Sequence, residues 1–400
     1  MVGPVAPRER LVTLDALRGF AMLGVLLGNL AHLYSGMWAD WQPPRGYADI
    51  FSHYFISVVV QSKAQTLLTF LFGFGFANQI VRASGASYWR RVLALFGFGL
   101  AHVTLLWWGD VLWTYAVAAP FLLLFVRVSN RTRVIVGGIF IFVGTAMFRE
   151  EHMARFLMGL VYDPDRHDYA TPLSMAIQFG THTQTMIEQI KYTPIFSIAF
   201  FPAYVMWILG NFLLGYAAGT AKLFERDGAD HLPVFRRIFW IGFALGIGAT
   251  AFEVLNMTGV IATWRYEEPL ALVFSGITAL NYCGLALLFA ASVVLLAQRP
   301  FWRRVFQIVA PVGRMPLTTY LSQSLICTTV IYHWGFDRVA HWNGFDYLWF
   351  GFVVYAFQIA FSNWWFTKFR FGPLEWLWRR ATYSKAVVAS PDRASPASAP

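Results

Sequence analysis

Ten long apolar runs constrain the fold of this chain more than any other feature of its sequence. They lie near residues 11–34, 55–80, 92–108, 111–126, 134–148, 195–221, 238–258, 270–297, 305–333 and 347–366. About 20 apolar residues in an α-helix cross the hydrocarbon core of a bilayer. Helices also satisfy every backbone polar group internally, as lipid requires. The runs therefore predict an all-α fold, a polytopic transmembrane helix bundle with about ten spans.

The composition excludes an ordinary water-soluble enzyme of this length. Of 400 residues, 57% are hydrophobic and 13% are charged, whereas soluble domains are about 25% charged. The two cysteines, Cys283 and Cys327, lie inside apolar runs and suggest no disulfide framework or metal site. Residues 11–34 are too long for the core of a signal peptide, so we interpret them as the first span.

The distribution of Lys and Arg predicts an orientation. With both termini in the cytoplasm, the inner loops carry 21 of these residues and the outer loops carry seven. Cytoplasmic loops of membrane proteins are enriched in Lys and Arg. This bias explains the net charge of +10 without a nucleic-acid partner and makes the lipid bilayer the expected partner. It also favours an even number of spans.

The rest of the chain is organised around one predicted membrane domain, residues 1–383. A longer, more polar segment at 149–193 is expected on the extracytoplasmic side. Residues 369–383 alternate aromatic and basic side chains, which is typical of an interfacial helix on the cytoplasmic leaflet. Residues 384–400 are rich in Ala, Ser and Pro and are predicted to be disordered. Glycines spaced four apart predict close helix contacts; they are Gly24/Gly28, Gly215/Gly219 and Gly242/Gly246.

Ionisable side chains at membrane depth are costly, so each one raises a functional question. Asp15 and Arg18 are three residues apart and share a helical face, where they form either a structural ion pair or a site for an anionic group such as a phosphate. Arg314, followed by Pro316, is a second phosphate-binding candidate, and snorkelling to headgroups is its alternative. The further candidates for substrate binding are Asn29, Tyr115, Tyr320 and Gln323.

His102 and Asp110 are the strongest candidates for acid–base chemistry. A carboxylate that binds one ring nitrogen of histidine fixes the tautomer and leaves the other nitrogen to act as a general base. Eight residues of helix span about 12 Å, so contact between this pair requires a break near Gly109. His32 and His53 are competing candidates, and a plain structural hydrogen bond from His102 to another helix is the alternative.

Three stretches resemble the YeiB-type family of bacterial polytopic membrane proteins, a domain of unknown function. They are LVTLDALRGFAMLGVLLGNL at 11–30, RRVLALFGFGLAHVTLLWWGDVLWTYA at 90–116, and GRMPLTTYLSQSLICT at 313–328 together with FRFGPLEWLWRRATY at 369–383. The resemblance covers nearly the whole chain. It implies a multi-pass protein of the bacterial plasma (inner) membrane.

That family is distantly similar to the transmembrane acyltransferases, which carry an acyl group from cytoplasmic acyl-CoA to an acceptor across the membrane. The similarity lies in the first span, at residues 15–19. In the bacterial O-acyltransferases a histidine follows the arginine of this pattern by eleven positions. Here that position is Asn29, which cannot act as a general base at neutral pH. The resemblance therefore implies acyl-CoA as a donor substrate, with His102 or His32 in place of the missing base.

Three functions remain open from the sequence. The first is a membrane acyltransferase with a small-molecule, glycan or lipid acceptor at the extracytoplasmic side and no covalently bound cofactor. The second is a transporter or flippase for a small or lipid-linked substrate, although no internal repeat supports it. The third is a non-catalytic partner or sensor subunit. The sequence determines neither the acceptor and the acyl chain nor the oligomeric state.

Overall fold

The computed structural model describes residues 11–30, 45–82, 85–149, 172–261, 270–339 and 341–382, and every regular element in these ranges is a helix. The first half contains α1 (Val12–Asn29), α2 (Tyr47–Tyr54), η3 (Phe55–Val60), α3 (Lys63–Arg82), α4 (Gly85–Leu105), α5 (Leu112–Ala118), η4 (Ala119–Phe125) and α6 (Asn130–Arg149). The second half contains α8 (Pro172–Phe179), α9 (His182–Thr220), η5 (Glu225–His231), α10 (Leu232–Met257), α11 (Leu270–Ala297), α12 (Pro300–Arg314), α13 (Pro316–Ile331), α14 (Gly344–Lys368) and α15 (Pro373–Thr382). The all-α prediction is confirmed for this part of the chain.

Six of the described helical stretches are long and apolar enough to cross a membrane. They are Val12–Asn29, Tyr47–Ala77, Phe201–Thr220, Glu225–Met257, Leu272–Ala297 and Gly344–Lys368. Leu112–Phe125 is a shorter apolar helix. These helices indicate a membrane protein. The count of ten spans and the cytoplasmic placement of both termini stay predictions.

The run at 305–333, predicted as one span, is two helices. α12 ends at Arg314 and α13 begins at Pro316, with Met315 between them at φ −128° and ψ 56°. Proline has no N–H and its ring clashes with the preceding turn, so a continuous helix is broken at this position. Proline fits well as the first residue of α13.

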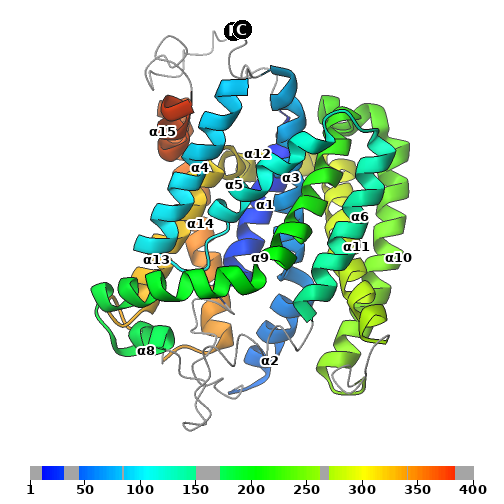
Figure 1. Ribbon diagram of the computed structural model, residues 1–400. Coiled ribbons are helices and arrows are strands. Elements are labelled where there is room, and N and C mark those ends of the chain that lie inside the picture. Colours follow the sequence, from blue (N-terminus) through cyan, green and yellow to red (C-terminus); the bar gives the residue numbers. More distant parts are fainter. Residues whose placement is uncertain are drawn as a thin grey trace.

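The sixth predicted run, 195–221, is part of a longer helix in the structure, because α9 starts at His182. A capping box fixes this start: the Thr181 side chain accepts from the Gln184 N–H, and the Gln184 side chain accepts from the Thr181 N–H. The first part of α9 lies across the lower end of the bundle beside α8 (Figure 1). Of the predicted outer segment 149–193, residues 150–171 lie outside the described ranges.

The long helices pack in close pairs. α10 lies along α11, α9 lies against both α3 and α6, and α1 lies along α12 (Figure 1). Glycines make these approaches possible. A Cβ on Gly215 would lie 1.9 Å from the Phe70 carbonyl oxygen, and one on Gly313 would lie 1.8 Å from the Asp15 carbonyl oxygen. Small residues at helix contacts are the usual means of packing in membranes.

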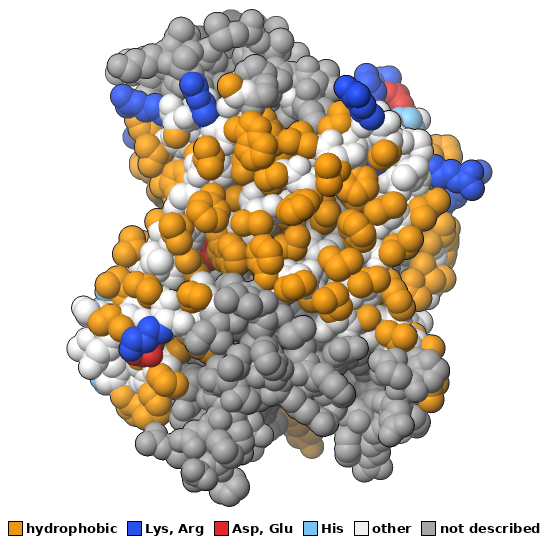
Figure 2. Space-filling view, viewed as in Figure 1, with side chains coloured by type: hydrophobic (Ala, Val, Ile, Leu, Met, Phe, Trp, Pro, Cys, Tyr) orange, Lys and Arg blue, Asp and Glu red, His pale blue; other side chains and the backbone are white. Residues whose placement is uncertain are grey.

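Both described ends of the chain lie at one end of the bundle, which is also the basic end. The Thr13 N–H, in the first turn of α1, donates to Asp227 of η5, and Arg303 of α12 lies 3.7 Å from the same carboxylate. Figure 2 shows Lys and Arg side chains gathered at the upper end of this face, above a broad apolar band. An apolar band next to an end rich in Lys and Arg is expected for a helix bundle embedded in lipid.

Candidate functional site

His102 and Asp110 form a direct hydrogen-bonded pair inside the bundle. The His102 Nδ1 atom lies 2.6 Å from Asp110 Oδ1, and both side chains are fully buried. An ionised carboxylate only accepts hydrogen bonds, so the proton belongs on Nδ1 of the neutral ring. The second carboxylate oxygen, Oδ2, accepts from the Trp113 N–H at 3.0 Å and caps the first turn of α5.

The predicted break between these two residues is present. α4 ends at Leu105, and α5 begins at Leu112. The Leu106 and Trp107 N–H groups both donate to the His102 carbonyl, which closes the end of α4. Gly109 is required in this turn, because a Cβ there would lie 2.5 Å from the Trp107 ring. The irregular turn carries Asp110 back to the histidine.

The other ring nitrogen of His102, Nε2, takes no part in the contact with Asp110. Among the described residues, Nε2 is buried and makes no hydrogen bond. The Tyr320 ring of α13 packs 5.2 Å from the imidazole, centroid to centroid. The Tyr320 hydroxyl accepts from the Val111 N–H at 3.3 Å. The tyrosine therefore holds the turn after Asp110 and covers the histidine at the same time.

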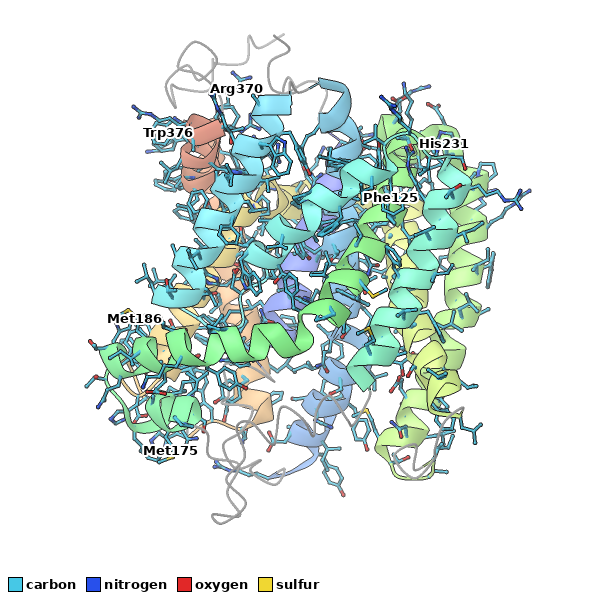
Figure 3. All side chains as sticks on the ribbon, in the orientation of Figure 1. Phe125, Met175, Met186, His231, Arg370 and Trp376 are labelled. Carbon is cyan, nitrogen blue, oxygen red and sulfur yellow. The ribbon has the colours of Figure 1, made fainter. Side chains whose placement is uncertain are left out.

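The pair lies deep within the bundle. Arg91, near the start of α4, stacks its guanidinium 4.0 Å from the Trp378 ring of α15. Figure 3 shows Arg370 and Trp376 at this same end, with Met175 and Met186 at the opposite end. His102 is eleven residues further along α4 than Arg91, or about 16 Å along the helix axis. This depth is about half the thickness of a hydrocarbon core.

Tyr115 belongs to a separate polar cluster beside the pair. Its hydroxyl lies 2.6 Å from Thr69 Oγ1, and the Thr69 hydroxyl also lies 2.6 Å from the Gln65 carbonyl. The Gln65 side-chain amide donates to the Tyr204 hydroxyl. Tyr204 interacts electrostatically with both Tyr115 and Asp110. Sequence analysis missed Tyr204 because its partners are far away in the chain.

Arg18 and Arg314 both lie near the crossing of α1 and α12. Arg18 Nη1 lies 2.8 Å from Asp15 Oδ1, so these two side chains form the ion pair that their spacing predicted. A Cβ on Gly313, next to Arg314, would lie 2.9 Å from Arg18 Cβ. The Arg314 guanidinium stacks 3.8 Å from the Phe366 ring of α14. The two arginines thus share one region near the basic end.

Glu375 is a functional candidate that sequence analysis passed over. This buried residue of α15 accepts from the Leu317 and Thr318 N–H groups at 2.7 and 3.1 Å, and from the Thr318 hydroxyl at 2.6 Å. It therefore caps the N-terminus of α13 from a distant helix. Burial raises the pKa of Glu375, and the hydrogen bonds from Thr318 and Leu317 oppose that shift. The predicted interfacial helix is thereby attached to the bundle.

The remaining predicted residues lie elsewhere. Asn29 is the last residue of α1. Gln323 donates to Gln358 of α14 at 2.9 Å, which joins α13 to α14. His53 is in α2, beside Tyr54. His32 lies outside the described residues. Within the described ranges, no group of three or more His, Cys, Asp or Glu residues is arranged to hold a metal ion.

Comparisons with known proteins show similarity to uncharacterized proteins. A family model described as "Protein of unknown function (DUF418)" matches residues 218–385. "Uncharacterized protein YxaH" of Bacillus subtilis (strain 168) is 29% identical over 407 residues, which covers 95% of this chain and 96% of the relative. "Uncharacterized protein YeiB" of Escherichia coli (strain K12) is 28% identical over 413 residues, with 95% and 98% covered.

The chain resembles the YeiB-type family over nearly its whole length. A third relative, the "Uncharacterized 39.9 kDa protein in amylase 3'region" of Bacillus acidopullulyticus, is 26% identical over 398 residues, with 96% of each chain covered. All three matches run nearly from end to end. The family resemblance expected from the first span, the His102 region and the α13–α15 region is confirmed. The names of these three relatives state no activity.

Proposed function

We propose that this protein is a membrane acyltransferase that moves an acyl group from cytoplasmic acyl-CoA to an acceptor hydroxyl or amine at the extracytoplasmic side. The observation that carries the proposal is the buried His102–Asp110 pair, with Nδ1 bound by the carboxylate and Nε2 unengaged among the described residues. A histidine held in this way has the geometry of a general base.

The chemistry assigned to the pair is a balanced transfer. The His102 Nε2 atom removes the proton of the acceptor hydroxyl or amine as that oxygen or nitrogen attacks the thioester carbonyl carbon. The C–S bond then breaks, and the proton passes from the imidazolium to the departing CoA thiolate. Asp110 stabilises the imidazolium through the Nδ1 hydrogen bond. A buried carboxylate beside a transient cation is an effective stabiliser because the local dielectric is low.

The donor's phosphates are assigned to the two arginines near the basic end. Arg314 presents a planar guanidinium stacked on Phe366, and Arg18 is held in place by Asp15. Arginine suits phosphate because its planar fork of donors matches the phosphate oxygens. In this scheme the basic end faces the cytoplasm of a bacterial cell and lies in the inner membrane, as the Lys and Arg distribution favours.

Asn29 does not replace the histidine found in the transmembrane acyltransferases that the first span resembles. Asparagine accepts and donates hydrogen bonds but does not take up a proton at neutral pH. His102 enters from α4 instead of α1, so the proposed mechanism needs no base on the first span. His32 is a secondary candidate for the same role, and its substitution belongs in any test.

The experiment is ligand-induced thermal stabilisation of the full-length protein in detergent, with acetyl-CoA as the probe and CoA as the control. Saturable stabilisation of the wild type that is weakened at least tenfold in Arg18→Ala and Arg314→Ala would support the donor site. Folded wild-type protein that gains no stability at millimolar acetyl-CoA would contradict the proposal. Uptake of an unmodified substrate into proteoliposomes would then favour a transporter.

A further inference from the structure

A polar cavity of about 490 Å³ lies apart from His102, between α3, α6, α9, α10 and α11. Each of its nine lining residues has a side-chain group that is able to form hydrogen bonds. Ligand sites in proteins have volumes of about 300–1,000 Å³. Polar side chains inside a membrane bundle are costly and usually serve a function. The cavity therefore has the size and the lining of a binding site for a small molecule.

Among the described residues, the cavity has one carboxylate in its lining and one ammonium group close to it. The carboxylate belongs to Glu253. Lys63, which is buried behind Tyr282, lies 5.1 Å from the Tyr282 ring centroid and interacts electrostatically with Glu253. The Lys63 ammonium also donates to the Ser57 carbonyl at 3.0 Å. A site with one carboxylate and one nearby ammonium has no net preference for a cation or an anion.

The polar groups of the lining are placed so that acceptors and donors lie side by side. Glu253 Oε1 accepts from the Thr278 hydroxyl at 2.6 Å, which orients the carboxylate, and Asn256 stands one helical turn from Glu253 on the same face of α10. Carboxylates and amides provide acceptors and donors side by side. The buried indole N–H of Trp207 also lines the cavity and makes no hydrogen bond within the described part of the chain.

Two aromatic rings, Tyr204 and Trp207, form one wall of the cavity. The Tyr204 and Trp207 rings stack with an interplanar angle of 5°, and each ring offers an apolar face together with a polar edge. A molecule with a ring of C–H groups and several hydroxyls presents the complementary surface. Tyr204 also accepts a hydrogen bond from the side-chain amide of Gln65, which is another residue of the lining.

We propose that this cavity binds an uncharged polyhydroxylated molecule, such as a sugar ring, through Glu253, Asn256 and the Tyr204–Trp207 wall. The binding itself is independent of any reaction. The identification of this ligand as the acyl acceptor rests on the proposed function.

The test is binding of neutral sugars to the full-length protein purified in a polyoxyethylene detergent, because sugar-based detergents would compete. The probes are glucose, galactose and N-acetylglucosamine, with glucosamine as a cationic and gluconate as an anionic analogue, all in the absence of acetyl-CoA. Melting temperature is followed against probe concentration in the wild type, Glu253→Gln and Asn256→Ala. Glu225→Gln, on an exposed surface ion pair, is the matched control.

The expected result is a saturable rise in melting temperature with at least one neutral sugar. Its half-saturating concentration should increase at least tenfold in Glu253→Gln and in Asn256→Ala, and should not change in Glu225→Gln. Sugars also stabilise proteins by exclusion from their surface, and that effect is the same in all variants. Equal responses in wild type and both cavity variants, or tighter binding of a charged analogue, would overturn the proposal. Because acetyl-CoA is absent, failure here leaves the donor-site result untouched.

Discussion

The Nδ1 atom of His102 lies 2.6 Å from Oδ1 of Asp110, although a continuous helix would hold these residues about 12 Å apart. The helix ends at Leu105, and the turn that follows folds back over a glycine. A buried carboxylate and an imidazole in contact are expensive in lipid unless each satisfies the other. The irregular turn at membrane depth is therefore an indication of function.

The first prediction concerns this pair. His102→Gln should lower the rate of acyl transfer from acetyl-CoA, followed as CoA release with added acceptor, by about 10²- to 10⁴-fold, because general base catalysis typically contributes that much. Asp110→Asn should also lower this rate, because asparagine has one acceptor oxygen, whereas the two carboxylate oxygens accept from His102 Nδ1 and from the Trp113 N–H.

Binding of acetyl-CoA should be unchanged in both variants, which separates a lost base from a lost donor site. Full transfer activity in His102→Gln would assign the base to another residue, and His32→Gln would then be the next variant. Unfolded protein in either variant would be recognised by the loss of acetyl-CoA binding.

The second prediction concerns the pH dependence of stability at Glu375. Its pKa is raised by burial in the folded protein, so the folded state holds this proton more tightly than the unfolded state does. Stability from this group is fully present below the ordinary pKa of the carboxyl. It is lost as the pH rises through the raised value in the folded state.

Glu375→Gln carries no proton to lose at this position. The melting temperature of the wild type minus that of Glu375→Gln should therefore fall as the pH increases from about 4.5 to neutrality. Thermal unfolding in detergent, at matched ionic strength, measures the difference. A difference that rises with pH would show that the hydrogen bonds from Leu317 and Thr318 outweigh burial.

The third prediction uses two glycines of α10. A Cβ on Gly242 would lie 2.6 Å from the Leu288 backbone nitrogen, whereas one on Gly248 would meet nothing within 4 Å. Gly242→Ala should therefore lower the free energy of unfolding by about 1–3 kcal/mol through overpacking. Gly248→Ala should leave it unchanged or raise it by up to about 1 kcal/mol through helix propensity. Equal thermal stability in the two variants would contradict the close packing of α10 on α11.

The fourth prediction concerns orientation. Asp230→Cys lies at the basic end in η5, and Lys191→Cys lies in the first part of α9; both sites are exposed. The native Cys283 and Cys327 are first replaced with alanine. In spheroplasts, a membrane-impermeant maleimide should label Lys191→Cys directly and Asp230→Cys only after lysis. The reverse labelling pattern would show that the basic end faces the outside of the cell. Labelling of both sites in intact spheroplasts would exclude an arrangement with the two ends on opposite sides of the membrane.

The sequence predicted the parts of this protein that depend on local composition and period. Apolar runs of about 20 residues identified a helical membrane protein, because lipid leaves few other backbone solutions. Glycine pairs such as Gly242/Gly246 indicated close helix contacts, and these contacts are present against Gly284 of α11. The pairing of Arg18 with Asp15 also follows from a spacing of three residues on one helix.

Other features were hidden from the sequence because they join residues far apart in the chain. Glu375 caps α13 across 57 positions, and the Gln65–Tyr204 hydrogen bond spans 139. No local pattern encodes such partners. The 39-residue length of α9 was missed because polar residues near its capping box obscured the start of the helix.

The sequence by itself therefore determined that this chain is a helical membrane protein, and it supplied His102 and Asp110 as candidates. Only the tertiary structure decided that the two side chains meet, that Nε2 makes no hydrogen bond among the described residues, and that a separate polar cavity lies between α3, α6, α9, α10 and α11. The physical reason is that helix formation in lipid follows from the apolarity and length of each segment. Which buried polar groups satisfy one another depends on how the segments pack.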